Sequence, residues 1–391
     1  MAPTPFRLRA RGARLQPQVL EFFAGIGLAR MGLEAAGFKV TWANDYEPDK
    51  KAMYTAQFGD DAHFVLGDIA AVTPADLPHG AQLAWASSPC TDLSLAGNRA
   101  GLDGDQSGTF WQWIRLLGGL GDQRPPVVVL ENVVGLATSH GGDDLTAAIR
   151  AMNGLGYSVD VLAIDARRFV PQSRPRLFVV GAQNAPADDP MANPDLRPEW
   201  LSWVFSDKSL VTHRATLPEP PAHRVDGLSG VIEPIPLDDE RWWSQERTDA
   251  FIASLSPIQW ERLNRLRREH GSSYRTAYRR TRAGVAVWEV RADEISGCLR
   301  TARGGSSKQA VVRVGAGKIR IRWMTPCEYA RLMGAGEYDL ASARTNQALF
   351  GFGDAVAVPV VEWLAQNYLM PLIRSVWGID EAAQGDVANV K

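Results

Sequence analysis

The chain has 391 residues, of which 45% are hydrophobic and 22% are charged, as in an ordinary globular protein long enough for two domains. No apolar run approaches the length of a membrane-spanning helix, and the three cysteines are too far apart for a disulfide framework or a CxxC zinc pattern. We therefore expect a cytoplasmic protein with no membrane partner and no metal site.

Residues 1–16 form a basic N-terminal tail with four arginines and no acidic residue. The favoured interpretation is a solvated tail that touches nucleic-acid phosphate. A targeting signal of the transit-peptide kind is the alternative.

Residues 17–182 alternate short apolar runs with helical patterns. The runs are rich in Val, Leu and aromatic residues and end at turn residues, as buried strands do; they cover 19–25, 39–45, 81–87, 126–132 and 176–182. Helical spacing follows at 27–37 and 108–120. The alternation predicts an α/β, Rossmann-like fold with a doubly wound, mostly parallel sheet.

A further strand region, third in chain order, ends at Gly67-Asp68-Ile69. The ends of the first three strands carry residues suited to a nucleoside cofactor. A Gly-rich turn before a helix lets a ligand approach the backbone, and an acid 20 residues later can hold ribose hydroxyls. Each acid alone is more often a helix cap or turn residue, and NAD, FAD and S-adenosylmethionine all remain open. The residues concerned are Phe23, Gly25, Gly27, Asp45, Tyr46 and Asp68.

A thiol and a carboxylate follow the next two strands. Cys90 comes after Pro89 at the end of the fourth strand, and Glu131 ends the fifth. Both therefore fall on the edge of the sheet that the cofactor residues share. Arg174 and Arg176 alternate before the last strand and would point two cations at one site if extended. The alternative for Cys90 is a buried core residue, since free cysteine is commonly buried.

The second half of the chain separates acidic from basic residues. Residues 183–237 lose the strand–helix rhythm and gather prolines, whereas 256–271 read as a helix capped by Ser256 and started by Pro257. From 262 to 322 there are 16 Lys and Arg against four Asp and Glu, with Tyr and Trp interleaved. This composition predicts a polyanion-binding face. For 262–270 alone, a solvated helix face is the alternative.

Six segments resemble, in content, order and spacing, the motif series of the DNA (cytosine-5)-methyltransferases: FAGIG, SPCTDLS, ENV, QSRPR, TPCEYARLMG and GDAVAVP. The resemblance covers roughly 18–182 and 324–378. It implies a tail (1–16), a catalytic S-adenosylmethionine-binding domain (17–182), a target-recognition region (183–322) and a return to the catalytic domain (323–380).

The resemblance also implies a mechanism and a partner. Cys90 would attack carbon 6 of a cytosine flipped out of a specific duplex DNA sequence, so that carbon 5 can accept a methyl group from S-adenosylmethionine. Glu131 would hold ring nitrogen 3 and the amine, Arg174 would orient the base, and Arg176 would support Glu131.

Further residues take binding roles from the same resemblance. Those assigned to the cofactor are Phe23, Gly25, Ile26, Gly27, Asp45, Tyr46, Asp68, Ile69, Pro89, Phe110 and Asp354. Those assigned to the target base and DNA are Ser94, Asn132, Val133, Gln172, Arg300, Thr301, Arg303, Gly304 and Gly305. For the Gly-rich loop around 300–306, an ordinary surface turn is the alternative.

Three positions depart from the family pattern: Thr91 stands where Gln is common, Leu28 where Gly is usual, and Asp354 where Asn is usual. None removes a catalytic group, but the last puts the cofactor contact of Asp354 in doubt. We expect a monomer that protects host DNA beside a restriction or phage-defence system. A tRNA or RNA cytosine-5 methyltransferase of the same fold and a non-catalytic DNA-binding relative remain alternatives.

Overall fold

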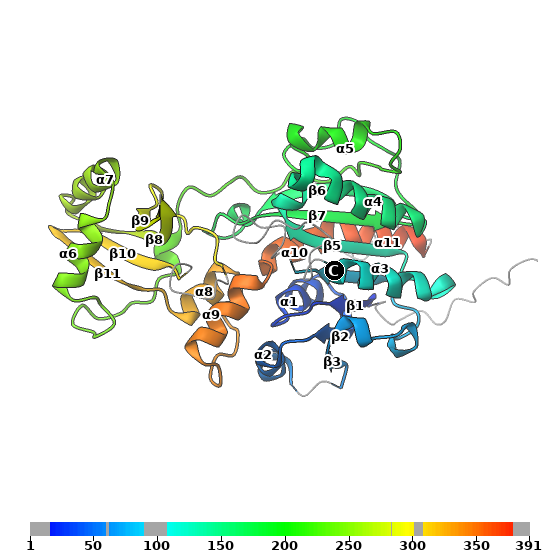
Figure 1. Cartoon of the computed structure of the whole chain (residues 1–391), viewed down its shortest axis with the longest axis horizontal. Coiled ribbons are helices and arrows are strands. Elements are labelled where there is room, and N and C mark those ends of the chain that lie inside the picture. Colours follow the sequence, from blue (N-terminus) through cyan, green and yellow to red (C-terminus); the bar gives the residue numbers. More distant parts are fainter. Residues whose placement is uncertain (1–15, 60–61, 90–107, 283, 301–307, 378–391) are drawn as a thin grey trace, which may run out of the picture.

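The computed structural model describes residues 16–59, 62–89, 108–282, 284–300 and 308–377. The expectations for the basic tail, Cys90, Thr91, Ser94 and the loop residues Thr301, Arg303, Gly304 and Gly305 lie outside these ranges. Two compact parts make up the chain (Figure 1). We call residues 16–232 with 324–377 the catalytic body, and residues 233–323 the recognition module, after the roles that the sequence resemblance implies for them.

A seven-stranded sheet forms the centre of the catalytic body, in the order β3-β2-β1-β4-β5-β7-β6. The first five strands in that order run parallel, whereas β7 is antiparallel to both of its neighbours. The mostly parallel sheet is thus confirmed, and all predicted strands are present. Strand β6 was not predicted. The bounds are β1 Gln18–Phe22, β2 Lys39–Asp45, β3 Phe64–Leu66, β4 Leu83–Ser87, β5 Val127–Val133, β6 Ser158–Asp165 and β7 Pro175–Ala182.

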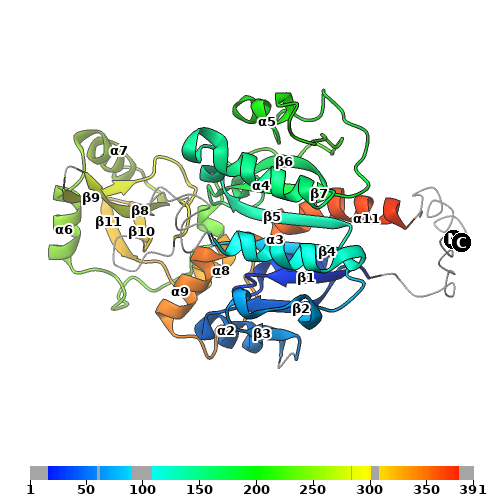
Figure 2. The same ribbon diagram turned by 45° about the vertical axis from the view of Figure 1, so that its right-hand side comes forward.

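Helices cover both faces of this sheet (Figures 1 and 2). Alternate residues of a strand point to opposite faces: Val19 packs with α1 and α10, whereas Leu20 packs in the cluster under α3 and α4. Two hydrophobic clusters therefore sandwich the sheet. The helix bounds are α1 Leu28–Ala35, α2 Pro48–Phe58, α3 Thr109–Gly119, α4 Asp143–Gly154, α10 Val358–Leu364 and α11 Met370–Val376.

The C-terminal segment returns to the catalytic body through α8 (Pro326–Leu332), α9 (Thr345–Asp354), α10 and α11. The helical run Thr345–Val376 is apolar and long enough to cross a membrane, which differs from the expectation that no apolar run approaches that length. Of its most apolar window, 67% is buried inside the protein. Its hydropathy is accordingly that of core helices packed against α1 and the sheet.

The recognition module is an antiparallel sheet in the order β11-β10-β8-β9 with two helices on one face. Helix α7 begins at Pro257 behind the cap of Ser256, as the sequence predicted. The basic run at 275–282 lies within β8. The bounds are α6 Gln245–Ala253, α7 Pro257–Arg267, β8 Ser272–Arg282, β9 Val285–Val290, β10 Ala310–Gly315 and β11 Lys318–Trp323.

Residues 183–232, which the sequence grouped with the recognition region, pack on the catalytic body. They are irregular apart from short helical turns such as α5 (Ser202–Ser206). Arg197 Nε donates to the buried Asp160 of β6 at 2.8 Å, and Tyr368 donates to the same carboxylate at 2.9 Å. This buried network joins the segment to β6 and to the C-terminal helices.

A buried ion pair joins the recognition module to the body. Arg322 of β11 donates to Glu328 of α8 at 2.8 Å, and both side chains are at most 1% exposed. Glu328 also accepts the Thr325 amide at 2.9 Å and completes the capping box of α8. The end of the recognition sheet is thus attached directly to a core helix.

Candidate active site

The Gly-rich turn after β1 combines a tightly packed glycine with an open one. An added Cβ on Gly27 would lie 2.3 Å from Phe58, so α1 could not sit where it does with any larger residue. An added Cβ on Gly25 would meet no atom within 4 Å. Phe23 follows β1 directly and precedes both glycines. Its φ is positive, at 57°, which is a strained conformation of the kind found at ligand sites. The turn therefore leaves space for a ligand above Gly25.

Asp45 fixes this turn to the end of β2. Its carboxylate is 4% exposed and accepts the Gly25 amide and the Glu47 amide, both at 2.9 Å. Each carboxylate oxygen keeps acceptor capacity for a hydroxyl donor. Next to it, the Tyr46 side chain is 49% exposed. Open space, an anchored carboxylate and an exposed ring fit a nucleoside cofactor.

The end of β3 reaches the same edge. Asn44 donates to the carbonyls of Val65 and Gly67 at 2.9 and 3.0 Å, which ties β2 to the turn that carries Asp68 and Ile69. Asp68 is exposed and caps a short 3₁₀ turn by accepting the Ala70 amide at 2.8 Å. The cap uses one carboxylate oxygen. A cofactor role for Asp68 and Ile69 stays a prediction.

Two residues assigned to the cofactor belong to the core. The Ile26 side chain is fully buried under α9, where an added Cβ on Gly351 would approach it to 2.7 Å. A cofactor contact of Ile26 would therefore be made by its backbone, and its assignment to the cofactor stays a prediction. Phe110 is also fully buried, with its ring 6.0 Å from Trp113. The expectation that Phe110 and the half-buried Pro89 line the methyl channel stays a prediction.

Glu131 and Arg176 form an ion pair at the end of β5. Arg176 Nε lies 3.1 Å from Glu131 Oε1, with the two side chains 13% and 7% exposed. Glu131 is the register partner of Ser87, the last residue of β4. The chain continues from Ser87 through two further residues to Cys90. The carboxylate therefore lies beside the start of the segment that carries the cysteine.

Asn132 holds the same segment. Its Nδ2 donates to Ser88 Oγ at 3.3 Å, and its Oδ1 accepts the Val133 amide at 2.8 Å. Asn132 is 3% exposed and Val133 is half-buried. Asn132 thus shapes the site by fixing the chain after β4 to the end of β5.

Arg174 lies just before β7 and binds three backbone carbonyls. It donates to Leu299 at 2.8 Å, to Gly353 at 2.9 Å and to Ala355 at 2.5 Å. Arg174 is 1% exposed, so its guanidinium serves chiefly to gather segments that are far apart in sequence. The expected role of Arg174 in orienting the base stays a prediction.

Cys298 lies between the two arginines, a neighbour that the sequence analysis missed. Arg174 donates to its Sγ at 3.3 Å, and the charge of Arg176 also acts on the thiol. Burial raises the pKa of the Cys298 thiol, but Arg174, Arg176 and Arg300 lower it more, so that the pKa falls below its ordinary value. No local pattern signals this contact, because 124 residues separate Cys298 from Arg174.

Gln172 is fully buried and does not face DNA. Its Oε1 accepts the Leu299 amide at 3.1 Å, and its Nε2 donates to the Leu332 carbonyl at 2.8 Å. Both ends of the amide are therefore occupied by backbone. This corrects the expected DNA contact: Gln172 connects the recognition module to α8.

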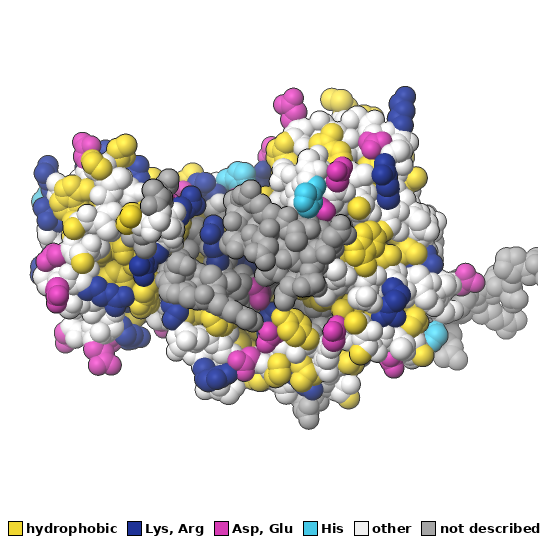
Figure 3. Space-filling model, in the orientation of Figure 1, with side chains coloured by type: hydrophobic (Ala, Val, Ile, Leu, Met, Phe, Trp, Pro, Cys, Tyr) yellow, Lys and Arg dark blue, Asp and Glu magenta, His cyan; other side chains and the backbone are white. Residues whose placement is uncertain are grey.

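The arginines of the recognition module divide into paired and unpaired groups. Arg275 is 7% exposed and pairs with Glu294 at 2.9 Å, and Arg280 lies 3.5 Å from Glu289. Arg247 and Arg279, in contrast, have no ion-pair partner among the described residues. Figure 3 shows Lys and Arg side chains over the module and along its junction with the body.

Arg247 and Arg279 flank an open pocket of about 290 Å³ lined by three tryptophans, Trp243, Trp288 and Trp323. The guanidinium of Arg247 lies 3.9 Å from the Trp243 ring centre. Burial and the nearby charge of Arg279 lower the pKa of Arg247. Two cations close enough to repel one another, at a pocket lined by tryptophan rings, suit a phosphate and a stacked base.

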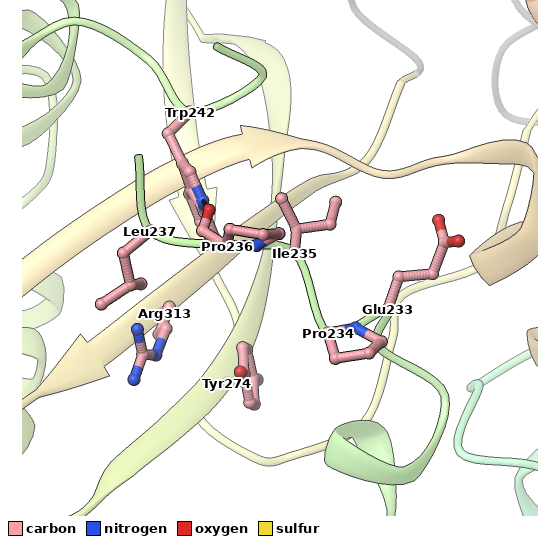
Figure 4. Close-up of a pocket in the computed structure, with 8 residues that line it drawn as sticks. All are labelled: Glu233, Pro234, Ile235, Pro236, Leu237, Trp242, Tyr274 and Arg313. Carbon is pink, nitrogen blue, oxygen red and sulfur yellow. Dashed lines mark hydrogen bonds between the residues drawn. The ribbon is translucent and has the colours of Figure 1, made fainter. Parts of the chain in front are cut away.

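A second pocket, of about 310 Å³, lies on the opposite face of the recognition sheet (Figure 4). Tyr274 and Arg313 are register partners there, and they alternate with residues that pack under α6 and α7. The segment 233–237 runs across them. This pocket lies where the linker from the catalytic body meets the sheet. In the described part of the chain, no group of three or more His, Cys, Asp or Glu residues could hold a metal.

Comparisons with known proteins identify the family. The model of the C-5 cytosine-specific DNA methylase family matches residues 18–369. The type II methyltransferase M.Bsp6I of Bacillus sp. (strain RFL6) is 26% identical over 356 residues, which cover 90% of this chain and 98% of that protein. M.HhaI of Haemophilus parahaemolyticus is 28% identical over 166 residues, 42% of this chain and 49% of that protein.

Solved structures share the fold. The S. pombe Dnmt2 methyltransferase aligns with a TM-score of 0.56 and 16% identity, over 93% of this chain and 99% of that one. An E. coli prophage-encoded putative DNA modification methyltransferase aligns with a TM-score of 0.54 and 16% identity, over 92% and 100%. Since the family match spans most of the sequence, the chain belongs to the C-5 cytosine-specific DNA methylases and is a DNA (cytosine-5)-methyltransferase.

Proposed function

We propose that this enzyme methylates carbon 5 of a cytosine flipped out of a specific duplex DNA sequence, with Cys90 as the covalent nucleophile. The observation that carries the proposal is the Glu131–Arg176 pair, 3.1 Å apart, beside the strand that leads to Cys90. The open turn above Gly25 lies on the same edge of the sheet and supports S-adenosylmethionine as the methyl donor.

The chemistry explains why these groups are needed together. Carbon 5 of cytosine is a poor nucleophile, because the ring is electron-poor. A bond from the Cys90 thiolate to carbon 6 places the electron pair on carbon 5, which can then attack an electrophilic carbon. The cofactor supplies that carbon as the methyl group of a sulfonium. Loss of the carbon 5 proton then expels the thiolate and restores the aromatic ring.

Glu131 is the group that makes the addition possible. Attack at carbon 6 builds negative charge on ring nitrogen 3, so the carboxyl that binds this nitrogen must bring or share a proton. Arg176 Nε holds the carboxyl in place from β7. Asn132 fixes the neighbouring chain, and Arg174 positions the segments around the pocket.

The recognition module would supply the DNA contacts. Its basic segment attracts the phosphate backbone, and Arg247 and Arg279 offer two cations without carboxylate partners among the described residues. Arg300 lies close enough to Cys298 to lower its pKa, and so stands near the catalytic edge. We infer a monomeric, cytoplasmic enzyme. A role in host DNA protection is supported by the names of its relatives, which are type II methyltransferases.

Bisulfite sequencing tests the proposal. DNA is taken from a methylation-free bacterial host that expresses the wild-type chain or Cys90→Ala. We expect protected cytosines in one short repeated context with the wild type and none with the variant. Soluble protein that leaves every cytosine unprotected would overturn the DNA assignment. The same protein would then be assayed on tRNA.

A further inference from the structure

Three tryptophan rings meet at the end of the recognition sheet that adjoins the catalytic body. The Trp243 ring centre lies 5.5 Å from that of Trp288 and 5.2 Å from that of Trp323. The ring centres of Trp288 and Trp323 are 5.6 Å apart. Trp323 ends β11, and Thr325, two residues later, caps α8 of the catalytic body. The cluster therefore lies near the junction between the two parts of the molecule.

The strands beneath the cluster contribute small side chains. Trp323 is the register partner of Ala310, which pairs in turn with Ala277, and both alanines are fully buried. Two short side chains in one row leave room for larger rings to lie over the sheet. The Trp243 amide donates to the Ile321 carbonyl of β11 at 2.8 Å, which holds this residue alongside the strand. The register of the sheet thus sets the position of the cluster.

Two arginines stand at the pocket that these rings line. The Arg247 guanidinium lies 3.9 Å from the Trp243 ring centre and 5.4 Å from that of Trp323. Arg279 is the register partner of Trp288 and lines the same pocket. Both arginines are exposed, and neither has an ion-pair partner in the described part of the chain. The pocket thus offers positive charge and aromatic surface together.

This combination fits an unpaired nucleotide better than a duplex or an acidic peptide. A tryptophan face can stack on a base only where the base is exposed, and bases inside a duplex already stack on their neighbours. An acidic peptide would use the charges but not the ring faces. Cationic grooves with aromatic rings are typical of sites for single-stranded nucleic acid. The pocket volume of about 290 Å³ lies near the lower limit for small-ligand sites, about 300 Å³, and suits one nucleotide.

We propose that this pocket is a binding site for an unpaired nucleotide of a DNA strand. The base stacks on a tryptophan face, and the adjacent phosphate binds the guanidinium groups of Arg247 and Arg279. Binding there is independent of sequence, since every base has an aromatic face. The site goes beyond methyl transfer, because it gives the recognition module an affinity for gapped or single-stranded DNA. Phosphates of a duplex can contact the same arginines, but paired bases cannot reach the rings.

Binding of a single-stranded oligonucleotide to the full-length protein tests the proposal. Fluorescence anisotropy measures the Kd for labelled oligo-dT of about 12 nucleotides, within the range of about 4–16 that single-strand sites cover. We expect Trp288→Leu to raise this Kd about tenfold, which corresponds to about 1.4 kcal/mol. Trp288→Phe keeps a ring and should bind within about threefold of the wild type. The Kd for a blunt duplex should be unchanged in both variants.

A change in the ligand separates stacking from charge. An oligonucleotide of the same length with abasic residues keeps the phosphates but offers no base to stack. The wild type should bind it about as weakly as Trp288→Leu binds oligo-dT, and Trp288→Leu should weaken its binding no further. This comparison needs only the wild type if Trp288→Leu lowers the yield of folded protein. Equal binding of the two oligonucleotides by the wild type would overturn the proposal.

Trp260 of α7 provides the matched control. Its ring also carries a cation, the Arg267 guanidinium at 5.7 Å, but it does not line the pocket. Trp260→Leu should leave the Kd for oligo-dT unchanged. A Kd that Trp288→Leu does not alter, or an equal loss of affinity with Trp260→Leu, would overturn the proposal.

The choice of DNA and the independence from catalysis are tested in the same assay. Oligo-rU that binds more tightly than oligo-dT would overturn the assignment to DNA. No cofactor is present, so that the result does not depend on methyl transfer. Failure of the proposed function would leave the binding of oligo-dT intact, whereas failure of this inference would leave the bisulfite result intact.

Discussion

The catalytic edge and the recognition module use arginine in opposite ways. At the edge, Arg174 is 1% exposed and binds backbone carbonyls, so that its place is determined by three separate segments. In the module, Arg247 stacks on Trp243 at an exposed pocket and has no ion-pair partner among the described residues. A buried group bound to several backbone segments defines one geometry, whereas exposed charges attract a polyanion and tolerate substitution. This difference predicts four effects.

Glu131→Gln should have the largest effect. The amide keeps the shape of the side chain but cannot bring or share the proton that attack at carbon 6 requires. We expect kcat to fall by roughly 10²–10⁴ with DNA affinity little changed. Single-turnover transfer of a labelled methyl group measures it, with exposed Glu246→Gln as the control. A kcat for Glu131→Gln within threefold of the wild type would show that Glu131 takes no part in the proton transfer.

Arg174→Met should break the architecture of the catalytic edge. The change leaves the carbonyls of Leu299, Gly353 and Ala355 without their donor, and each buried unpaired group costs about 1–3 kcal/mol. We expect the free energy of unfolding in urea to fall by about 3 kcal/mol. Exposed Arg280→Gln should change it by less than about 0.5 kcal/mol. An equal decrease in the free energy of unfolding for the two variants would contradict the structural role of the buried arginine.

Glu21 makes stability depend on pH. It is fully buried under the Gly-rich turn, and burial raises its pKa to about 8 from 4.5. The folded state then binds the proton more tightly than the unfolded state, so that stability declines as pH rises between about 4.5 and 8, by up to about 1.4 kcal/mol per pH unit. Glu21→Gln should flatten this part of the curve in urea titrations. Exposed Asp122→Asn should not. If the slope of stability against pH is unchanged in Glu21→Gln, the decline in stability is due to another titratable group.

Arg247→Ala with Arg279→Ala should have the smallest effect. Loss of two phosphate contacts should reduce the slope of log K against log salt by about 2, equally for cognate and unrelated duplexes, and leave kcat at saturating DNA unchanged. Fluorescence anisotropy over a salt series measures it. Arg241→Ala is the control, because Arg241 already pairs with Asp239 at 2.7 Å. A loss of affinity confined to the cognate duplex would instead indicate that these arginines contact the bases.

Several features of the site could be predicted from local sequence. Continuously apolar strands that stop at turn residues can be recognised from local sequence. Their ends predicted the positions of the Gly-rich turn, of the acid at the end of β2 and of the carboxylate at the end of β5. Helix α7 followed from its serine cap and proline start. Strand β6 (Ser158–Asp165) was missed because Asp160 interrupts its apolar run, and the partners that allow this carboxylate to be buried, Arg197 and Tyr368, are distant in sequence.

What escaped prediction consists of contacts between distant segments. The sequence identifies Gln172 and Arg174 as polar residues before a strand, and nothing local says that their partners are Leu299, Leu332 and the 353–355 turn. The same holds for Cys298 and for Lys50, whose ammonium lies 3.0 Å from the Asp354 carboxylate.

The sequence by itself determined a mostly parallel α/β sheet, the order of the motifs, the family and the basic segment at 262–322. These follow from short-range patterns, because strand periodicity and turn chemistry are local properties. Only the tertiary structure decided which polar groups face a ligand and which hold the fold together. Burial and hydrogen-bond partners depend on segments that meet through packing, and a residue such as Gln172 changes its role when both ends of its amide meet backbone.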